Sequence, residues 1–414
     1  MDNVYDIKRA KNLNYILPVN TKLNRVSSDL KKGKAAVCIH LHYLDTIETY
    51  LKYMEMIPDS IDIFVTFSNN EVKEVLQKAA VGRRKNCRFI NKQNRGRDIS
   101  AFLVACRREL LQYEYICFLH DKKEKKSIYK KDTDAWIRCL WENMLGSEEY
   151  IDNILSVFLE NSALGLLTPP YPVTEHFSTF YMYAWGRNFD ITKELSERMK
   201  LKCNLDIAKP PVTLGTVFWA RTAALKKLFE IEWEYESFDQ EPLKEDGTLS
   251  HAIERILAYV AQDAGFDSGW VMTDQYAGVH FENMQHALKT AFNKLNSALG
   301  ISWVGEIDSY ESKVQEMLSF VKKHEELYIY GAGNYGMRCL AMLRNGRTSP
   351  TAFLVSDSSN NPKDIQGIPV YSIKEVELNP RCGIVVGVAE AYREDVIQAI
   401  RNKSPEFSNI YLWK

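Results

Sequence analysis

Short apolar runs alternate with amphipathic stretches from residue 35 onward, a pattern typical of strands followed by helices. The runs predict strands over 35–40, 61–67, 87–90 and 115–119, with helices over 46–57, 71–80 and 100–112. This alternation predicts an α/β fold, a mostly parallel sheet with helices on both faces. Because ligands bind beyond the carboxyl ends of the strands in such sheets, the residues after each strand are the first candidates for chemistry.

The later part of the chain predicts a division into domains. A strand over 216–220 runs into a helix over 222–229, and another helix fits 251–264. Residues 283–323 look helical with a break near Gly300, and a new strand–turn–helix–strand alternation starts at Leu327. We therefore predict an N-terminal arm over 1–33, an α/β domain over 34–282, a helical connector over 283–325 and a small Rossmann-like domain over 326–414.

Composition narrows the class of protein. The 414 residues carry a formal net charge of -1, with 45% hydrophobic and 26% charged residues, the balance of an ordinary globular protein. No basic excess is present to neutralise a nucleic-acid backbone, so we expect no nucleic-acid partner. Residues 1–12 do not resemble a signal peptide and no apolar run is long enough for a bilayer, which predicts a cytoplasmic location. The eight cysteines include no CxxC pair, so we interpret them as reduced thiols rather than zinc ligands.

The segment Asn94-Arg95-Gly96-Arg97-Asp98 lies between a predicted strand and a predicted helix. Its two arginines are suited to hold a diphosphate, because a guanidinium pairs with phosphate oxygens through two hydrogen bonds. Gly96 would permit a tight turn and Asp98 would cap the helix. The alternative is a surface turn with a capping aspartate, and spacing alone does not separate the two.

The segment after the strand over 115–119 carries His120, Asp121, Lys122 and Lys123. Asp121 could hold a divalent cation, Mg²⁺ or Mn²⁺, that bridges phosphate oxygens. The lysines could instead neutralise a leaving diphosphate directly. The alternative is a solvated charge run, which we favour for the later lysines; for His120 and Asp121 we favour a role in function.

Two further segments supply candidates. In Gly215–Arg221, Arg221 at the end of an apolar strand is unexpected, whereas Trp219 could simply belong to the core.

The carboxylates Glu241, Glu245 and Asp246 precede a glycine turn, and a carboxylate at such a place could deprotonate a hydroxyl group. His251, Glu254 and Arg255 follow within one turn of a helix. The alternative is a helix N-cap at Thr248 or Ser250 beside Asp246.

The predicted C-terminal domain has its own glycine motif. Gly331, Gly333 and Gly336 form a GxGxxG pattern between a strand and a helix, and Asp357 follows the next strand near the offset of a ribose-binding acid. The pattern predicts a Rossmann-like turn and offers a nucleotide site, or the glycines serve only helix packing. A dehydrogenase-like use with NAD(P) lacks a visible catalytic partner, and we expect no tightly bound organic cofactor.

The Asn94–Asp98, Leu119–Lys123, Gly215–Arg221 and Asp246–Arg255 segments, in this order over about residues 35–290, resemble the rhamnan synthesis protein F family of bacterial polysaccharide glycosyltransferases. The order of parts also resembles inverting GT-A enzymes. In those, an aspartate-x-aspartate motif holds the metal where this chain has His120-Asp121-Lys122, so metal dependence is open. The last 90 or so residues resemble the N-terminal module of sugar acetyltransferases.

The resemblance implies a cytoplasmic glycosyltransferase, peripheral at the inner membrane face and working beside other polysaccharide-assembly enzymes. Its donor would be a dTDP-sugar such as dTDP-rhamnose, and its acceptor a cell-surface or lipid-linked glycan. Asp246 best matches the general base of such enzymes, with Glu241 and Glu245 as rivals. The predicted donor-binding residues are His40, His42, Thr66, Arg95, Gly96, Arg97, Asp98, His120, Asp121, Lys122, Trp219, Arg221 and His251. The rival hypothesis is a non-catalytic nucleotide-sugar-binding or scaffold protein.

Overall fold

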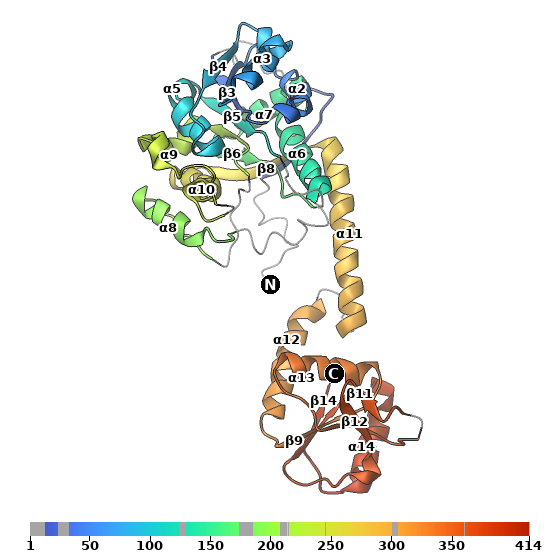
Figure 1. Cartoon of the computed structure of the whole chain (residues 1–414). Coiled ribbons are helices and arrows are strands. Elements are labelled where there is room, and N and C mark those ends of the chain that lie inside the picture. Colours follow the sequence, from blue (N-terminus) through green and yellow to red (C-terminus); the bar gives the residue numbers. More distant parts are fainter. Residues whose placement is uncertain are drawn as a thin grey trace. The chain divides into compact units, whose positions relative to one another are not determined.

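The computed structural model describes residues 13–23, 33–123, 129–173, 185–207, 213, 215–244, 246–299, 305–359 and 361–413. The chain forms two compact units, Met1–Gln285 and His286–Lys414. Figure 1 shows the helices and strands of each unit. Among the described residues, no helix is long and apolar enough to cross a membrane.

The first unit is built on an eight-stranded sheet of order β1-β8-β6-β7-β5-β2-β3-β4. Its strands are β1 (Asn14–Leu17), β2 (Ala35–His40), β3 (Asp62–Phe67), β4 (Cys87–Asn91), β5 (Tyr115–His120), β6 (Leu164–Thr168), β7 (Phe218–Arg221) and β8 (Asp267–Thr273). All neighbouring strands pair in parallel except β7, which is antiparallel to both β5 and β6. The mostly parallel α/β sheet expected from the sequence is therefore confirmed.

Helices cover both faces of this sheet. One face carries α2 (Ile47–Met54), α3 (Asn70–Lys78), α6 (Lys130–Leu145) and α7 (Glu148–Glu160), and the other α4 (Arg97–Ser100), α5 (Arg107–Leu110), α8 (Phe189–Arg198), α9 (Lys226–Glu230) and α10 (Leu249–Asp263). Along β2, Val37 and Ile39 join the first core, and Ala36 and Cys38 join the second. The central strands β2, β5 and β6 are thus buried on both faces, which explains why they are mostly apolar runs, whereas the edge strands β1 and β4 are partly exposed.

Two details differ from the sequence expectation. The segment expected as a helix over 100–112 is divided, because a π-helical turn over Ala101–Ala105 separates α4 from α5. Part of the predicted N-terminal arm is β1, which pairs with β8 at the edge of the sheet. The rest of the arm, residues 1–12 and 24–32, lies outside the described residues.

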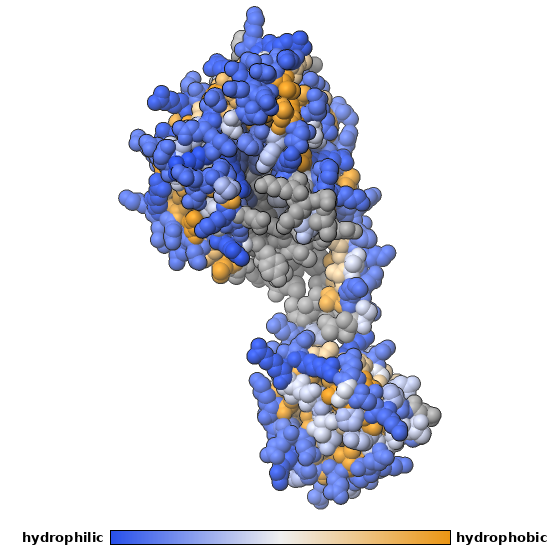
Figure 2. Space-filling model, in the orientation of Figure 1, coloured by the Kyte–Doolittle hydropathy of each residue, from blue (hydrophilic) through white to orange (hydrophobic). Residues whose placement is uncertain are grey.

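The second unit has a six-stranded sheet of order β11-β12-β10-β9-β13-β14. Its elements are β9 (Glu326–Tyr330), α13 (Asn334–Asn345), β10 (Ala352–Val355), β11 (Asp364–Ile365), β12 (Ile368–Ser372), β13 (Cys382–Val386), α14 (Arg393–Lys403) and β14 (Ile410–Leu412). The predicted connector contains the end of α11 (Asp274–Leu299) and α12 (Gly305–Val321). Met317 and Val321 of α12 lie in the core of this unit. On the face that Figure 2 displays, hydrophilic side chains dominate over both units.

Candidate functional site

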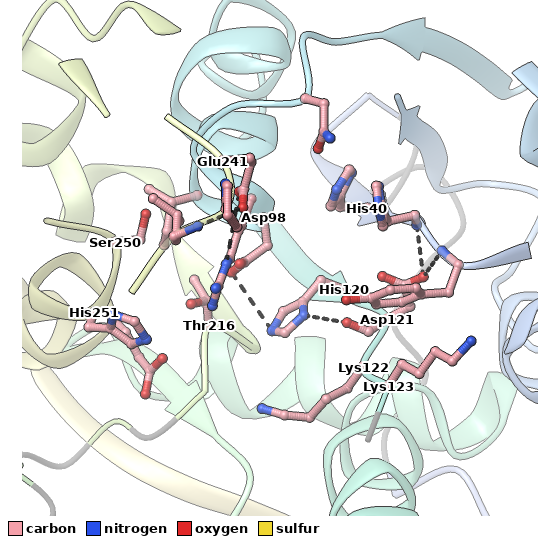
Figure 3. Close-up of a pocket in the computed structure, with 18 of the residues that line it drawn as sticks. His40, Asp98, His120, Asp121, Lys122, Lys123, Thr216, Glu241, Ser250 and His251 are labelled. Carbon is pink, nitrogen blue, oxygen red and sulfur yellow. Dashed lines mark hydrogen bonds and ion pairs between the residues drawn. The ribbon is translucent and has the colours of Figure 1, made fainter. Parts of the chain in front are cut away.

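A cavity of about 890 Å³ opens at the edge of the large sheet where β2 and β5 end. It is lined by His40, His42, Tyr43, Asn94, Arg97, Asp98, Ile99, His120, Asp121, Lys122, Lys123, Tyr129, Thr216, Glu241, Pro242, Leu243, Ser250, His251 and Glu254. Ser250 and His251 lie on one side, and Asp121, Lys122 and Lys123 on the other (Figure 3). Parallel pairing aligns the carboxyl ends of β2, β3 and β5, which is why residues distant in sequence meet here.

Asp121 organises one wall of the cavity. Its Oδ2 accepts hydrogen bonds from the backbone N–H groups of His42 and Tyr43, both at 2.7 Å. Burial raises the pKa of Asp121, and the two N–H groups act in the opposite direction. The carboxylate therefore fixes the loop that follows β2.

The surroundings of Asp121 do not fit a divalent-cation site. One carboxylate oxygen is committed to two N–H groups, and the next two residues are Lys122 and Lys123. In the described part of the chain, no three His, Cys, Asp or Glu side chains are grouped so that they could hold a metal ion. The structure thus provides Asp121 with backbone partners rather than with further oxygen ligands.

His40, His120, Asp98 and Thr216 form the floor of the cavity. His120 Nδ1 donates to the carbonyl of Asp121 at 2.8 Å, which leaves its Nε2 facing Asp98 Oδ2 at 3.8 Å. Burial opposes the charge of Asp98, but His120 and a hydrogen bond from Thr216 act against burial, and the pKa of Asp98 is lowered. Asp98 is therefore a buried, ionised carboxylate rather than a simple surface cap.

Three cations belong to the cavity wall. Arg97 follows the left-handed Gly96, and itself has a φ of 45°, an unfavourable conformation for a residue with a Cβ. Lys122 Nζ lies 3.5 Å from the ring centroid of Trp136, and Lys123 Nζ donates a hydrogen bond to Asp45 Oδ2 at 2.5 Å. Behind the wall, burial lowers the pKa of Lys92 to about 8, with Asp98 and Glu241 acting against burial.

Side chains from the 241–243 loop and α10 complete the lining of the cavity. Glu241 accepts a hydrogen bond from the N–H of Leu243 at Oε2, and its Oε1 lies 4.0 Å from Arg97 Nε. His251 Nδ1 lies 2.8 Å from the hydroxyl of Thr248, and burial lowers its pKa. Glu254 Oε1 accepts from the N–H of Gly215 at 2.9 Å.

Most of the residues predicted from sequence are therefore brought together. Those that line the cavity are His40, His42, Arg97, Asp98, His120, Asp121, Lys122, Glu241 and His251. Thr66 supports His40 from β3. Arg95 instead donates to the carbonyls of Phe238 and Glu236, and a Cβ on Gly96 would lie 2.7 Å from the Phe238 ring, so both fix the 92–97 loop.

Asp246, the best sequence match to a general base, does not line the cavity. Its carboxylate accepts from the backbone N–H of Arg187 at 3.0 Å and from the Asn188 amide at 2.5 Å. Burial opposes its charge, but these hydrogen bonds and that of Gly247 prevail and lower its pKa. Through these hydrogen bonds, Asp246 holds the segment at 185–188 against the turn that precedes α10. Its rival Glu245 lies outside the described residues.

Trp219 and Arg221, both predicted donor-binding residues, do not line this cavity. Trp219 is fully buried and donates to the carbonyl of Met144 at 3.0 Å. Arg221 pairs with Tyr115, the first residue of β5, because β7 runs antiparallel. The end of β7 therefore lies at the amino edge of the neighbouring parallel strands, where Arg221 donates to the carbonyls of Leu164 and Phe158.

Several lining residues were not among the predicted site residues. Asn94, Lys123, Thr216, Ser250 and Glu254 lie inside the segments already quoted, and Tyr43 directly follows His42. Tyr129, Pro242 and Leu243 carry no such signal, because only long-range packing brings them to the sheet edge.

The glycine motif of the second unit is explained by close backbone packing. A Cβ on Gly331 would lie 2.4 Å from the Gly387 carbonyl oxygen, and one on Gly336 would lie 1.8 Å from that of Gly331. Gly333 faces open space, and Asp357 is exposed and accepts from the N–H of Ser359. Nucleotide binding here stays a prediction, as does the resemblance to the acetyltransferase module.

Comparison with known proteins identifies the first unit. Residues 1–266 match the family described as Rhamnan synthesis protein F. Over 249 residues the chain is 28% identical to proteins described as uncharacterized protein WxcX from two strains of Xanthomonas campestris pv. campestris. The match covers 59% of this chain and 34% of those relatives, so the chain spans about a third of their length. Since the family match extends over more than half of the chain, including the whole cavity, this protein belongs to the Rhamnan synthesis protein F family.

Proposed function

We propose that the cavity is the active site of a glycosyltransferase that takes a nucleotide-diphosphate sugar, with dTDP-rhamnose favoured, and adds its sugar to a glycan acceptor. The observation that carries this proposal is that cations and carboxylates from segments distant in sequence gather around one cavity. Lys122, Lys123 and Arg97 supply positive charge, and Glu241 and Glu254 supply carboxylates. Family membership supports a role in rhamnan synthesis.

The cations serve the leaving group. As the bond between the anomeric carbon and the diphosphate breaks, the electron pair moves onto the diphosphate oxygen. Positive groups that are already in place stabilise this charge without reorganisation. Lys122 and Arg97 are therefore assigned to the diphosphate, and no step requires a metal ion.

Glu241 is assigned as the general base. Of the three acidic candidates, Glu241 lines the cavity, whereas Asp246 is committed to Arg187 and Asn188. The acceptor hydroxyl oxygen attacks the anomeric carbon, and its proton passes to Glu241. Attack from the face opposite the leaving diphosphate inverts the configuration.

The test compares Glu241→Gln with Asp246→Asn in the full chain. We expect Glu241→Gln to lower kcat by about a hundred- to ten-thousandfold, the usual contribution of a general base, with nearly unchanged donor affinity. Asp246→Asn should lower stability more than kcat. Release of dTDP from dTDP-rhamnose in the presence of a rhamnan acceptor measures turnover, and calorimetry measures binding.

Two results would redirect the proposal. Loss of turnover in Asp246→Asn with full turnover in Glu241→Gln would return the base to Asp246. Donor binding by the wild-type protein without transfer to any glycan would favour a non-catalytic binding protein of a polysaccharide-assembly complex.

A further inference from the structure

His40 is held from one side by a hydroxyl group. It ends β2, its register partner on β3 is Thr66, and both side chains are buried. His40 Nδ1 lies 3.0 Å from Thr66 Oγ1. The ring is therefore anchored through one nitrogen while its residue lines the cavity.

The hydrogen bonds of Thr66 assign the protons in this pair. Its hydroxyl oxygen also lies 3.3 Å from the carbonyl oxygen of Ile39. A carbonyl only accepts, so both contacts can be hydrogen bonds only when the single hydroxyl proton goes to Ile39 and the hydroxyl oxygen accepts from His40 Nδ1–H. In a neutral ring this leaves the other nitrogen, Nε2, with a lone pair and no proton.

The surroundings keep the ring neutral. Burial, followed by the charge of Lys92, lowers the pKa of His40 to about 3, and His120 and His42 act in the same direction. Asp98 acts the other way and does not overcome them. His40 therefore carries no charge near neutral pH.

His120, the register partner of His40 on β5, has a different arrangement. Its Nδ1 also carries a proton, donated to the Asp121 carbonyl, but its Nε2 turns toward Asp98 at 3.8 Å. No protein group among the described residues donates to Nε2 of His40. On the floor of the cavity, Nε2 of His120 thus faces the Asp98 carboxylate, whereas Nε2 of His40 can accept a hydrogen bond from a ligand.

We propose that the Thr66 hydroxyl holds His40 in the Nδ1–H tautomer, so that its Nε2 accepts a hydrogen bond from a hydroxyl group of the transferred sugar. This inference rests on the proposed function. A diphosphate oxygen offers no proton to Nε2 near neutral pH, whereas a sugar hydroxyl does. Asp98, a second acceptor on the same floor, suits a neighbouring hydroxyl. The floor would therefore take the sugar, while Lys122 and Arg97 take the diphosphate.

The first test reads the tautomer without any ligand. Nitrogen-15 NMR of histidine-labelled protein distinguishes protonated from unprotonated ring nitrogens. We expect the His40 signals to show a protonated Nδ1 and an unprotonated Nε2 near neutral pH. A proton on Nε2 in the wild-type protein would overturn the inference, whatever ligand the protein binds.

The second test compares Thr66→Val, which removes the hydroxyl, with Thr66→Ser, which keeps it. Calorimetry with dTDP-rhamnose and with dTDP separates the sugar from the nucleotide. We expect Thr66→Val to weaken dTDP-rhamnose binding about three- to tenfold, the size of one neutral hydrogen bond, and to leave dTDP binding unchanged. Thr66→Ser should restore the affinity, and thermal melts check that both variants fold.

Three other outcomes of the binding comparison would each contradict part of the inference. Equal dTDP-rhamnose affinity in the wild-type protein and Thr66→Val would overturn the inference. An equal loss for dTDP and dTDP-rhamnose would place the bonded group on the nucleotide and overturn the assignment to the sugar. If the wild-type protein bound neither compound, the proposed function and the ligand part of this inference would both fail, while the NMR result would still decide the tautomer.

Discussion

The ammonium group of Lys122 lies 3.5 Å from the centroid of the Trp136 indole ring, which belongs to α6. Lys122 itself follows β5 at the sheet edge. A cation over an indole is attracted to the negative face of the ring, most strongly where water is partly excluded. Trp136 thus positions the side chain that we assign to the diphosphate.

Replacing the indole should weaken nucleotide binding through Lys122. For Trp136→Leu we expect the Kd for dTDP to rise about two- to thirtyfold, the range of a cation–π interaction, and Trp136→Phe should lose less. Calorimetry measures both. Lys73→Met is the matched control, because Lys73 also lies over an aromatic ring, that of Phe67, but does not line the cavity. An unchanged Kd in Trp136→Leu would contradict the positioning role.

Asp121→Asn should act mainly on stability. The neutral amide weakens the hydrogen bonds from the N–H groups of His42 and Tyr43, so the free energy of unfolding should fall by about 1–3 kcal/mol. Urea titration measures this loss. We also expect dTDP binding by the wild-type protein to be equal in EDTA and in Mn²⁺. Binding that requires Mn²⁺ and disappears in Asp121→Asn would instead indicate a metal ligand.

Arg221→Met should destabilise the protein without affecting the site. The side chain donates to the carbonyls of Leu164 and Phe158 and contacts the Tyr115 hydroxyl, and its removal leaves partly buried acceptors without their donor. We expect the free energy of unfolding to fall by about 2–4 kcal/mol, with unchanged dTDP affinity of the folded protein. Lys226→Met, at an exposed position on α9, is the control. A loss of dTDP affinity in Arg221→Met would show that the amino end of β5 affects nucleotide binding in the cavity, contrary to this prediction.

Stability should depend on pH through His40. Its pKa is about 3 in the folded protein against an ordinary value of 6.5, so between these values the unfolded chain binds more protons. The contribution of His40 is complete above pH 6.5 and falls as the pH drops toward 3, by on the order of 4 kcal/mol.

The variant His40→Asn isolates this contribution, because its amide can still donate to Thr66 but does not titrate. The free energy of unfolding should rise less between pH 4 and pH 7 in His40→Asn than in the wild-type protein. His286→Asn, at an exposed position on α11, should keep the wild-type slope. Equal slopes in all three proteins would mean that His40 titrates normally in the folded state.

The sequence by itself predicted the strands β2, β3, β4 and β5 and many of the residues that line the cavity. The apolar runs that form β2, β3 and β5 are fully buried or nearly so, and such runs can be recognised in the sequence alone. Polar residues that directly follow a run, such as His42 and Asp121, were assigned to one edge because parallel strands end together.

Only the tertiary structure decided the direction of β7 and the choice among the acids. A four-residue apolar strand has the same pattern in either direction, so the sequence could not exclude the antiparallel pairing that carries Arg221 away from the cavity. Likewise, Glu241 and Asp246 are similar carboxylates five positions apart. Their different roles come from contacts with Leu243 in one case and with Arg187 and Asn188 in the other. Local periodicity reports burial, whereas strand direction and side-chain partners depend on segments that are remote in sequence.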